Sequence, residues 1–458
     1  MNIIVCGAGK VGFSISKQLS VQGHSITVVD QSSELIQKLN ETQDVKGIVG
    51  RATFPSVLEK AGAEDTDMII AVTKNDETNM VICQVAHSIF NITKKIARIR
   101  TQEFLGTKWH KLYGKSNLPI DVIISPELEV AKSLQRKLEA PGALDSVPFA
   151  DGKVKVLEIN IGEICPIANK PLSKLTEKFP DLRANILGVI RGEKFVILKK
   201  KDKMLVNDKA FVVVSASQMN TTLSAFGHEE KMAKKILIIG GGNIGFNLAK
   251  NLEADSGGAR VKIIEKDKGR AELIANELNN TIVINGDGLD EDVLKEANIQ
   301  EAETILALTN DDEDNIMLSV LAEKNNPSKR TIALVTKQNY GLLQNSLKID
   351  DLVDPRLTTV STILKHVHKG TIETVYTLLD GEYEFIEAEV LETSELISKS
   401  IKDSGLPEEI RIGAIVRDKN IIIPKSDFKF EKKDLVVFLS KREHLPKVES
   451  LFRISSLI

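Results

Sequence analysis

The sequence predicts an α/β fold that occurs twice along the chain, each time as a doubly wound parallel sheet followed by a small α+β domain. Three observations lead to this prediction. Short motifs of the first half return in order in the second half, β-branched runs alternate with helix-length segments, and the composition changes after Pro141-Gly142. Strands separated by helical segments are typical of parallel sheets with crossover helices.

The internal repeat is carried by motifs that return with a nearly constant displacement. Gly7-Ala-Gly-Lys-Val-Gly12 returns as Gly240-Gly-Gly-Asn-Ile-Gly245. The other matched segments are 72–79 with 308–315, 120–126 with 349–355, and 188–191 with 414–417. Because a repeat of this kind is one structural unit written twice, we expect the same fold from both halves.

Each half is expected to divide into two domains. In the first half, strands of the parallel sheet are predicted over 3–6, 26–29, 46–49, 68–72, 95–99 and 122–124, and a helix from Pro126 to about Leu138. After Pro141-Gly142, strands are predicted over 154–161, 188–190, 194–198 and 210–214, with one clear helix over 172–178. The expected domains are 1–125, 140–225, 233–356 and 371–458.

Composition excludes several classes of protein. The 458 residues exceed a single domain of roughly 100–200 residues. A net charge of −3 and few aromatic residues argue against nucleic-acid binding. Three scattered cysteines predict neither a disulfide framework nor a metal site. The N-terminus reads as a first strand, and no apolar run approaches the roughly 20 residues of a membrane helix, so we expect a cytosolic protein.

The glycine motifs carry the strongest functional signal. Gly7, Gly9 and Gly12 stand between a predicted strand and a predicted helix over 11–20, where glycines permit a tight turn and close approach to a pyrophosphate. Asp30 ends the second predicted strand, and a carboxylate there accepts ribose hydroxyls and disfavours the 2′-phosphate of NADP. Gly240, Gly242, Gly245 and Glu265 repeat this pattern. Two Rossmann-like nucleotide sites are therefore predicted. The alternative is that the glycines only form a tight turn.

A second signal is the loop 73–79 and its copy 309–315, expected at the carboxyl edge of each sheet. Thr73 and Thr309 are candidates to bind the ribose or phosphate. For Asp76 and Asp312 the alternative is that they cap the following helices, with Glu77 and Glu313 complementing the helix dipoles.

Arg98 and Arg100 are expected on one face of the fifth strand, where one of them can pair with a phosphate. The corresponding segment 332–336 has no arginine, so the two sites are expected to differ in charge. The alternative is that both arginines are solvated.

The segment expected to fold as the first α+β domain, 140–225, contains no His, Trp or Tyr. A dehydrogenase needs a general acid–base pair opposite the nicotinamide, and this neighbour supplies no obvious candidate. The chain is therefore predicted to bind a nucleotide without transforming it, and not to be an enzyme.

These motifs resemble the TrkA family, the cytosolic regulatory subunits of bacterial Trk-type potassium uptake systems, which are built from paired RCK (KTN) domains. The resemblance covers essentially the full length. It is carried by the segments 3–12, 60–65, 76–80, 96–100, 141–144 and 240–245.

The resemblance implies that the small α+β domains are RCK C-terminal domains. It also implies a tetrameric ring at the inner face of the membrane, peripheral to a Trk-type potassium transporter, which the ring gates when NAD(H) or ATP/ADP binds. The cofactor-binding residues expected from the motifs and the resemblance together are Gly7, Ala8, Gly9, Lys10, Val11, Gly12, Asp30, Arg51, Thr73, Lys74, Arg98, Gly240, Gly241, Gly242, Asn243, Ile244, Gly245, Glu265, Asp287, Thr309 and Asn310.

The first half departs from the family at two positions. The family usually has Gly-Asp-Gly after the third strand; the second half keeps it as Gly286-Asp287-Gly288, whereas the first half reads Gly50-Arg51-Ala52. Lys74 stands where asparagine is usual. These two added cations predict that the first site favours a more anionic nucleotide, such as ATP over NAD.

Two other functions are consistent with the same motifs. One is an NAD-dependent oxidoreductase, and the other is a nucleotide-sensing regulator of a different ion transporter, such as an antiporter. A fused channel subunit is not expected, because no transmembrane segment is predicted.

Overall fold

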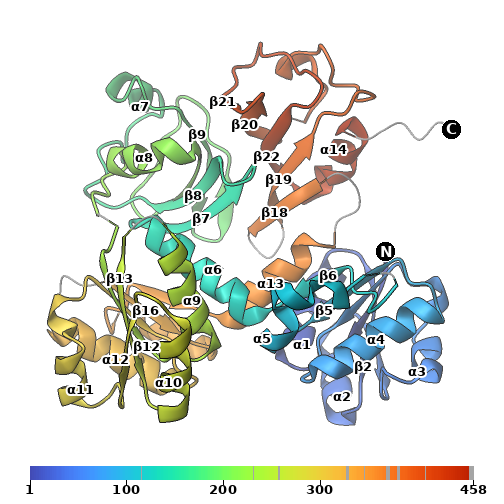
Figure 1. Ribbon diagram of the computed structural model, residues 1–458. Coiled ribbons are helices and arrows are strands. Elements are labelled where there is room, and N and C mark those ends of the chain that lie inside the picture. The colour runs from blue at the N-terminus through green and yellow to red at the C-terminus, as the bar shows by residue number, and fades with distance from the viewer. Residues whose placement is uncertain are drawn as a thin grey trace. The chain divides into compact units, whose positions relative to one another are not determined.

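The computed structural model describes the chain except residues 115, 231, 256–257, 326–329, 345, 368–371, 379–381, 408 and 453–458. It contains four lobes, which we name A (strands β1–β6), B (β7–β11), C (β12–β17) and D (β18–β22) (Figure 1). Lobes A and C form one compact unit, and lobes B and D form another.

Lobe A is a parallel six-stranded sheet with the strand order β3-β2-β1-β4-β5-β6. The order reverses between β1 and β4, where ligands bind in open α/β sheets. Its strands are β1 Asn2–Cys6, β2 Ser25–Asp30, β3 Lys46–Val49, β4 Met68–Ala71, β5 Lys94–Arg98 and β6 Val122–Ile124. Its helices are α1 Lys10–Val21, α2 Ser33–Thr42, α3 Pro55–Lys60, α4 Asp76–Ser88, α5 Gln102–Leu105 and α6 Pro126–Glu139.

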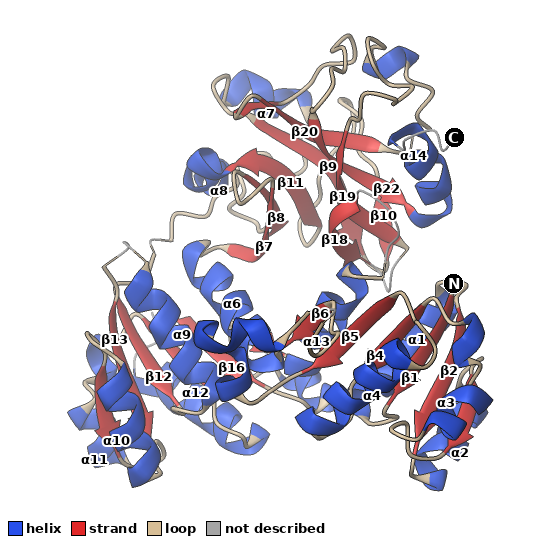
Figure 2. Cartoon of the chain, turned by 45° about the vertical axis from the view of Figure 1, so that its right-hand side comes forward, coloured by secondary structure: helices blue, strands red, loops and turns tan. Residues whose placement is uncertain are grey.

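Lobe C repeats this plan with the order β14-β13-β12-β15-β16-β17. Its strands are β12 Lys235–Ile239, β13 Arg260–Glu265, β14 Ile282–Asn285, β15 Thr304–Ala307, β16 Arg330–Leu334 and β17 Asp351–Val353. Its helices are α9 Asn243–Ala254, α10 Lys268–Glu277, α11 Glu291–Glu296, α12 Asp312–Asn325 and α13 Pro355–Lys365. Figure 2 shows the strands of both sheets flanked by helices. The fold class predicted from the sequence is confirmed.

Lobes B and D are antiparallel five-stranded sheets. Lobe B contains β7 Ala143–Phe149, β8 Val154–Asn160, β9 Ala184–Arg191, β10 Lys194–Val196, β11 Lys209–Ser215, α7 Ser173–Lys178 and α8 Met219–Ala225. Lobe D contains β18 Ile372–Leu378, β19 Tyr383–Glu389, β20 Arg411–Arg417, β21 Asn420–Ile422, β22 Leu435–Lys441 and α14 Leu445–Phe452.

The two copies of each lobe type pack against each other. Helix α13 of lobe C packs on α1 and β6 of lobe A, and Thr362 of α13 donates to Glu129 of α6 at 3.4 Å. Lobes B and D share a core that includes Phe211 and Phe385. Asn185 of lobe B also donates to the Ile412 carbonyl of lobe D at 2.9 Å. Each lobe therefore packs against the lobe of its own fold type, A against C and B against D.

Two elements of lobe B were not anticipated. Strand β7 contains Asp145 and Pro148, which obscure a strand pattern, but β7 is an edge strand next to β8, so a proline is tolerated there. Helix α8 is short and contains consecutive threonines, Thr221 and Thr222, so it carries little helical signal.

Within the described part of the chain, no helix has the length and apolar character needed to cross a membrane. All three cysteines are buried and free. Burial raises the pKa of the Cys6 and Cys83 thiols, which makes both poor nucleophiles.

Candidate nucleotide-binding sites

The glycine turns have the same geometry in lobes A and C. Gly7 and Gly240 both have φ of 112°, a conformation that favours glycine. A Cβ on Gly12 would lie 1.8 Å from the Gly7 carbonyl oxygen, and one on Gly245 would lie 2.1 Å from that of Gly240. The outer glycines of each motif are therefore required by the turn itself.

The middle glycines are different. Gly9 and Gly242 have φ of −64° and −60°, which any residue adopts, and a Cβ at either position would meet nothing within 4 Å. Both are helix N-caps without a side-chain capping bond, so unpaired backbone N–H groups of α1 and α9 are available to an anion. The protein does not need glycine there, but a closely approaching phosphate does, which argues against a purely structural role for the motif.

The acidic residues at the ends of β2 and β13 hold the glycine turns. Asp30 accepts the N–H of Ala8 at 2.6 Å and that of Ser32 at 2.8 Å. Glu265 accepts the N–H of Gly241 at 2.7 Å and that of Asp267 at 2.8 Å. Each carboxylate oxygen keeps a further lone pair for a ribose hydroxyl. The two acids thus connect the phosphate turn to the ribose position.

The residues after the third strand differ between the lobes, and packing explains one difference. A Cβ on Gly288 would lie 2.4 Å from Cγ2 of Ile239. Lobe A has Cys6 at the place of Ile239, and the smaller side chain leaves room for Ala52 in the same core cluster. Arg51 is exposed, and its guanidinium carbon Cζ lies 5.9 Å from the centroid of the Phe54 ring, over which it stacks. The charge at residue 51 can therefore change without disturbing the fold.

The loops after β4 and β15 are fixed by buried asparagines. Asn79 accepts the N–H and the hydroxyl of Thr73 at 2.9 and 2.7 Å, and its amide donates to the Arg98 carbonyl at 2.8 Å. Asn315 makes the same contacts with Thr309 and Leu334. The threonine hydroxyls thus already have a partner, and they retain acceptor capacity for a ligand.

Asp76 and Asp312 are not helix caps. The N-cap of α4 is Asn75, and Asp76 lies in the first turn, where it accepts the backbone N–H groups of Arg100 and Thr101. Asp312 accepts those of Thr336 and Lys337. Both aspartates connect the two loops at the carboxyl edge of each sheet, so the capping alternative is wrong in this respect.

Arg98, the last residue of β5, and Arg100, two residues beyond it, have different surroundings. Arg100 forms an ion pair with Glu127 at 2.9 Å. The Arg98 guanidinium has a buried Nε that lacks a hydrogen-bond partner among the described residues, and burial lowers its pKa. Of the two, Arg98 is the better candidate to meet a ligand phosphate.

Lobe C contains a cavity of about 330 Å3 at the topological switch point. This size is within the usual range for a small-molecule site. Six of the residues expected from the sequence line it: Gly240, Gly242, Glu265, Asp287, Thr309 and Asn310. Gly241, Asn243, Ile244 and Gly245 are not among the lining residues.

Two cations of this cavity were missed by sequence reasoning. Arg270 of α10 donates to the Gly241 carbonyl at 2.9 Å and to the Asn243 side chain at 3.2 Å. Lys266 pairs with Asp287 at 2.7 Å, and this hydrogen bond lowers the pKa of Asp287. In the sequence, the feature that could have pointed to them is their position just after Glu265, the acid expected to bind the ribose: Lys266 lies in the following loop and Arg270 in the following helix.

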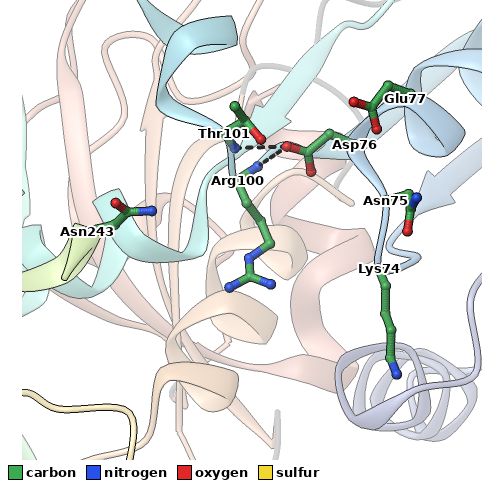
Figure 3. Close-up of a pocket in the computed structure, with 7 residues that line it drawn as sticks. All are labelled: Lys74, Asn75, Asp76, Glu77, Arg100, Thr101 and Asn243. Carbon is green, nitrogen blue, oxygen red and sulfur yellow. Dashed lines mark hydrogen bonds between the residues drawn. The ribbon is translucent and has the colours of Figure 1, made fainter. Parts of the chain in front are cut away.

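A second cavity, of about 360 Å3, adjoins the start of α4 in lobe A. Figure 3 shows its lining residues, including Lys74 and Arg100 of lobe A and Asn243 of lobe C. The dashed lines there are the two hydrogen bonds to Asp76. The side chains of Lys74 and Arg100 extend away from that carboxylate (Figure 3).

Comparisons with known proteins agree with this architecture. The TrkA-N domain family matches residues 3–126 and 236–355, and the TrkA-C domain family matches 156–227 and 385–453. The Trk system potassium uptake protein TrkA of Azorhizobium caulinodans is 44% identical over 99% of both chains. The protein of the same name from Vibrio alginolyticus is 36% identical over 99% of both chains.

Solved structures support the fold. The crystal structure of the GsuK RCK domain has a TM-score of 0.60 at 18% identity, covering 98% of this chain and 94% of that chain. The GsuK channel bound to NAD gives 0.60 at 17% identity, covering 98% and 78%. The curated relatives are named for potassium uptake and not for a reaction, in agreement with the prediction that this chain is not an enzyme. On the full-length identity and the four matched domains, the chain belongs to the TrkA family.

Proposed function

We propose that this chain is a cytoplasmic, nucleotide-binding regulatory subunit that gates potassium transport by a Trk-type membrane transporter, at the inner face of the cell membrane. One observation carries the proposal. The middle glycine of each turn, Gly9 or Gly242, stands open at a helix N-terminus beside a ribose-type acid, in a chain whose relatives are Trk system proteins.

The ligands we propose are NAD(H) and ATP or ADP, held by the residues named for each turn in the sequence analysis. The pyrophosphate lies at the N-terminus of α1 or α9, and the ribose hydroxyls donate to Asp30 or Glu265. In support, a GsuK structure of the same fold is bound to NAD.

Gating follows from linkage. A nucleotide shifts the equilibrium between two shapes of the assembly only by its difference in affinity for them, typically about 1–3 kcal/mol per coupled pair of sites. In a tetrameric ring the increments of identical sites add, so a modest preference becomes a switch. Residues 1–125 and 233–356 then sense the nucleotide, and residues 140–225 and 371–458 bind an effector or hold neighbouring subunits.

The test is potassium flux through the reconstituted membrane partner, with this subunit added and ATP, ADP, NAD or NADH titrated. The key variant is Gly242→Asp, since aspartate is a good N-cap and its charge repels a phosphate. Gly162→Asp is the control, because it places the same charge at an open glycine of lobe B.

We expect Gly242→Asp to abolish the response to at least one nucleotide, and Gly162→Asp to leave every response unchanged. If the flux response to one nucleotide persists in Gly9→Asp and also in Gly242→Asp, the proposed sites are refuted. Turnover of NADH with a small metabolite would favour an oxidoreductase, and nucleotide binding without any effect on flux would favour a different transporter.

A further inference from the structure

We propose that the two nucleotide sites divide their ligands by charge. Lobe A takes a mononucleotide with a di- or triphosphate chain, and lobe C takes a dinucleotide. This inference rests on the proposed function, because it assigns ligands to the same two glycine turns. It also goes further, because it makes one chain a sensor of two different metabolite classes.

The evidence begins with the residues around the lobe C cavity. Seven lining positions are charged in at least one of the two lobes. In lobe C they are Glu265, Lys266, Asp267, Arg270, Asp287, Asn310 and Asp314. At the same positions lobe A has Asp30, Gln31, Ser32, Leu35, Arg51, Lys74 and Thr78. Each lobe carries two cations, but lobe C has four carboxylates where lobe A has one.

The positions are equivalent in space as well as in sequence. Strand β2 pairs with β3 in the register in which β13 pairs with β14. The N–H of Gly50 donates to the Asp30 carbonyl at 2.9 Å, and the N–H of Gly286 donates to the Glu265 carbonyl at 3.0 Å. The segments after β3 and β14 therefore leave the sheets at the same point beside the ribose acid.

The cations of lobe C are already engaged. Lys266 pairs with Asp287, and Arg270 binds the glycine turn through the Gly241 carbonyl. In lobe A, Arg51 and Lys74 are exposed, and neither has an ion-pair partner among the residues that the structure describes. Two cations without an ion-pair partner among those residues are thus available at the site of lobe A.

The chemistry of the ligands fits this difference. A dinucleotide presents one pyrophosphate and two riboses, and its hydroxyls are hydrogen-bond donors that suit carboxylates such as Asp287 and Asp314. A nucleoside triphosphate presents additional anionic oxygens, which need cations and are repelled by carboxylates.

The experiment is calorimetric titration of the full chain with ATP and with NAD. Gly9→Asp and Gly242→Asp first assign each heat to a lobe. The double variant Arg51→Asp/Lys74→Asn then gives lobe A the residues of lobe C at these two positions. Lys46→Asp is the matched control, because Lys46 is exposed at the opposite end of β3.

We expect Gly9→Asp to remove the ATP heat and Gly242→Asp to remove the NAD heat. Arg51→Asp/Lys74→Asn should weaken ATP binding by about tenfold or more, as expected for reversing a charge a few ångströms from a phosphate. NAD binding in lobe C should change by less than about twofold, since lobe C is unaltered, and Lys46→Asp should leave both affinities unchanged.

An unchanged ATP-to-NAD affinity ratio in Arg51→Asp/Lys74→Asn would overturn the inference, as would loss of the ATP heat in Gly242→Asp alone. Both results leave nucleotide binding, and so the proposed function, intact. If neither ATP nor NAD gives a binding heat with the unmodified chain, the result would instead contradict the proposed function itself.

Discussion

Ala52 belongs to the same buried core cluster as Cys6 in lobe A, at the place where lobe C has Gly288 against Ile239. The two lobes distribute side-chain volume differently between these two positions. Lobe A has one more methyl group after β3 and a smaller side chain at the end of β1 than lobe C has at the equivalent positions. The segments Gly-Arg-Ala of lobe A and Gly-Asp-Gly of lobe C thus differ in two ways: the third residue differs in side-chain volume and the second in charge.

This difference in volume predicts that Gly288→Ala destabilises the chain by about 1–3 kcal/mol, because the added Cβ would lie 2.4 Å from Ile239. Adding Ile239→Cys should recover part of the loss, measured by urea unfolding of both variants. Losses that simply add in the double variant would show that the two positions are not coupled.

Asn79 gives a second prediction. Its buried amide donates to the Arg98 carbonyl while its oxygen holds Thr73. Asn79→Asp keeps the size but removes the donor and buries a charge, so we expect a loss of about 2–3 kcal/mol in unfolding free energy. Thr78→Asp, which gives lobe A the residue that lobe C has at that position, is the control. Equal stability of the two variants would contradict the role of the Asn79 amide.

The paired arginines of lobes B and D give a third prediction. Arg191 binds Asp208 through two hydrogen bonds of 2.8 and 2.7 Å, and Arg417 binds Asp434 in the same way. Asp208 and Asp434 are buried. Arg191→Met leaves a buried carboxylate without its cation and should cost about 2–3 kcal/mol, measured by thermal unfolding. In the double variant Arg191→Met/Asp208→Leu most of this loss should disappear. If the double variant instead loses as much stability as Arg191→Met, the loss comes from the packing of the arginine side chain.

A fourth prediction concerns pH. Burial raises the pKa of Glu384 on β19 to about 7, and Arg442 offsets part of that effect. A carboxyl group whose pKa is higher in the folded state costs nothing at low pH, where both states are protonated. The penalty develops as the pH rises from about 4.5 to 7 and then stays near 3 kcal/mol.

Glu384→Gln should therefore be more stable than the unmodified chain at pH 8 and equally stable at pH 4, by denaturant unfolding at several pH values. Glu395→Gln, at an exposed position of lobe D, serves as the control. A stability difference that does not depend on pH would assign the effect of Glu384→Gln to packing.

Much of this molecule was predictable because its signals are local. The strand pattern and the glycine turns gave the six strands of lobe A to within a residue at each end. Strand β7 was missed because Asp145 and Pro148 hide an edge strand, whose tolerance for proline depends on its neighbours. The pairing of lobe A with C and of B with D could not be read either, since it depends on contacts between residues far apart in the chain.

The site was predicted less completely than the fold. The glycines, Asp30 and Glu265 lie where the motif indicates, but Lys266 and Arg270 have no fixed spacing rule and become visible only when α10 is placed over the turn. Whether the named residues bind a nucleotide stays a prediction. The same holds for the four-domain division, whose fourth segment begins at residue 371, outside the described residues.

The central claim is that a nucleotide held at the glycine turns is a signal and not a reagent. Its most direct test combines NADH binding, potassium flux and NADH absorbance in one reconstituted preparation, with Gly242→Asp and Gly162→Asp side by side. We predict that NADH binds, alters flux and remains unoxidised, and that Gly242→Asp loses the first two effects while Gly162→Asp keeps them. Identical flux in the two variants, or steady oxidation of NADH by the unmodified chain, would contradict the claim.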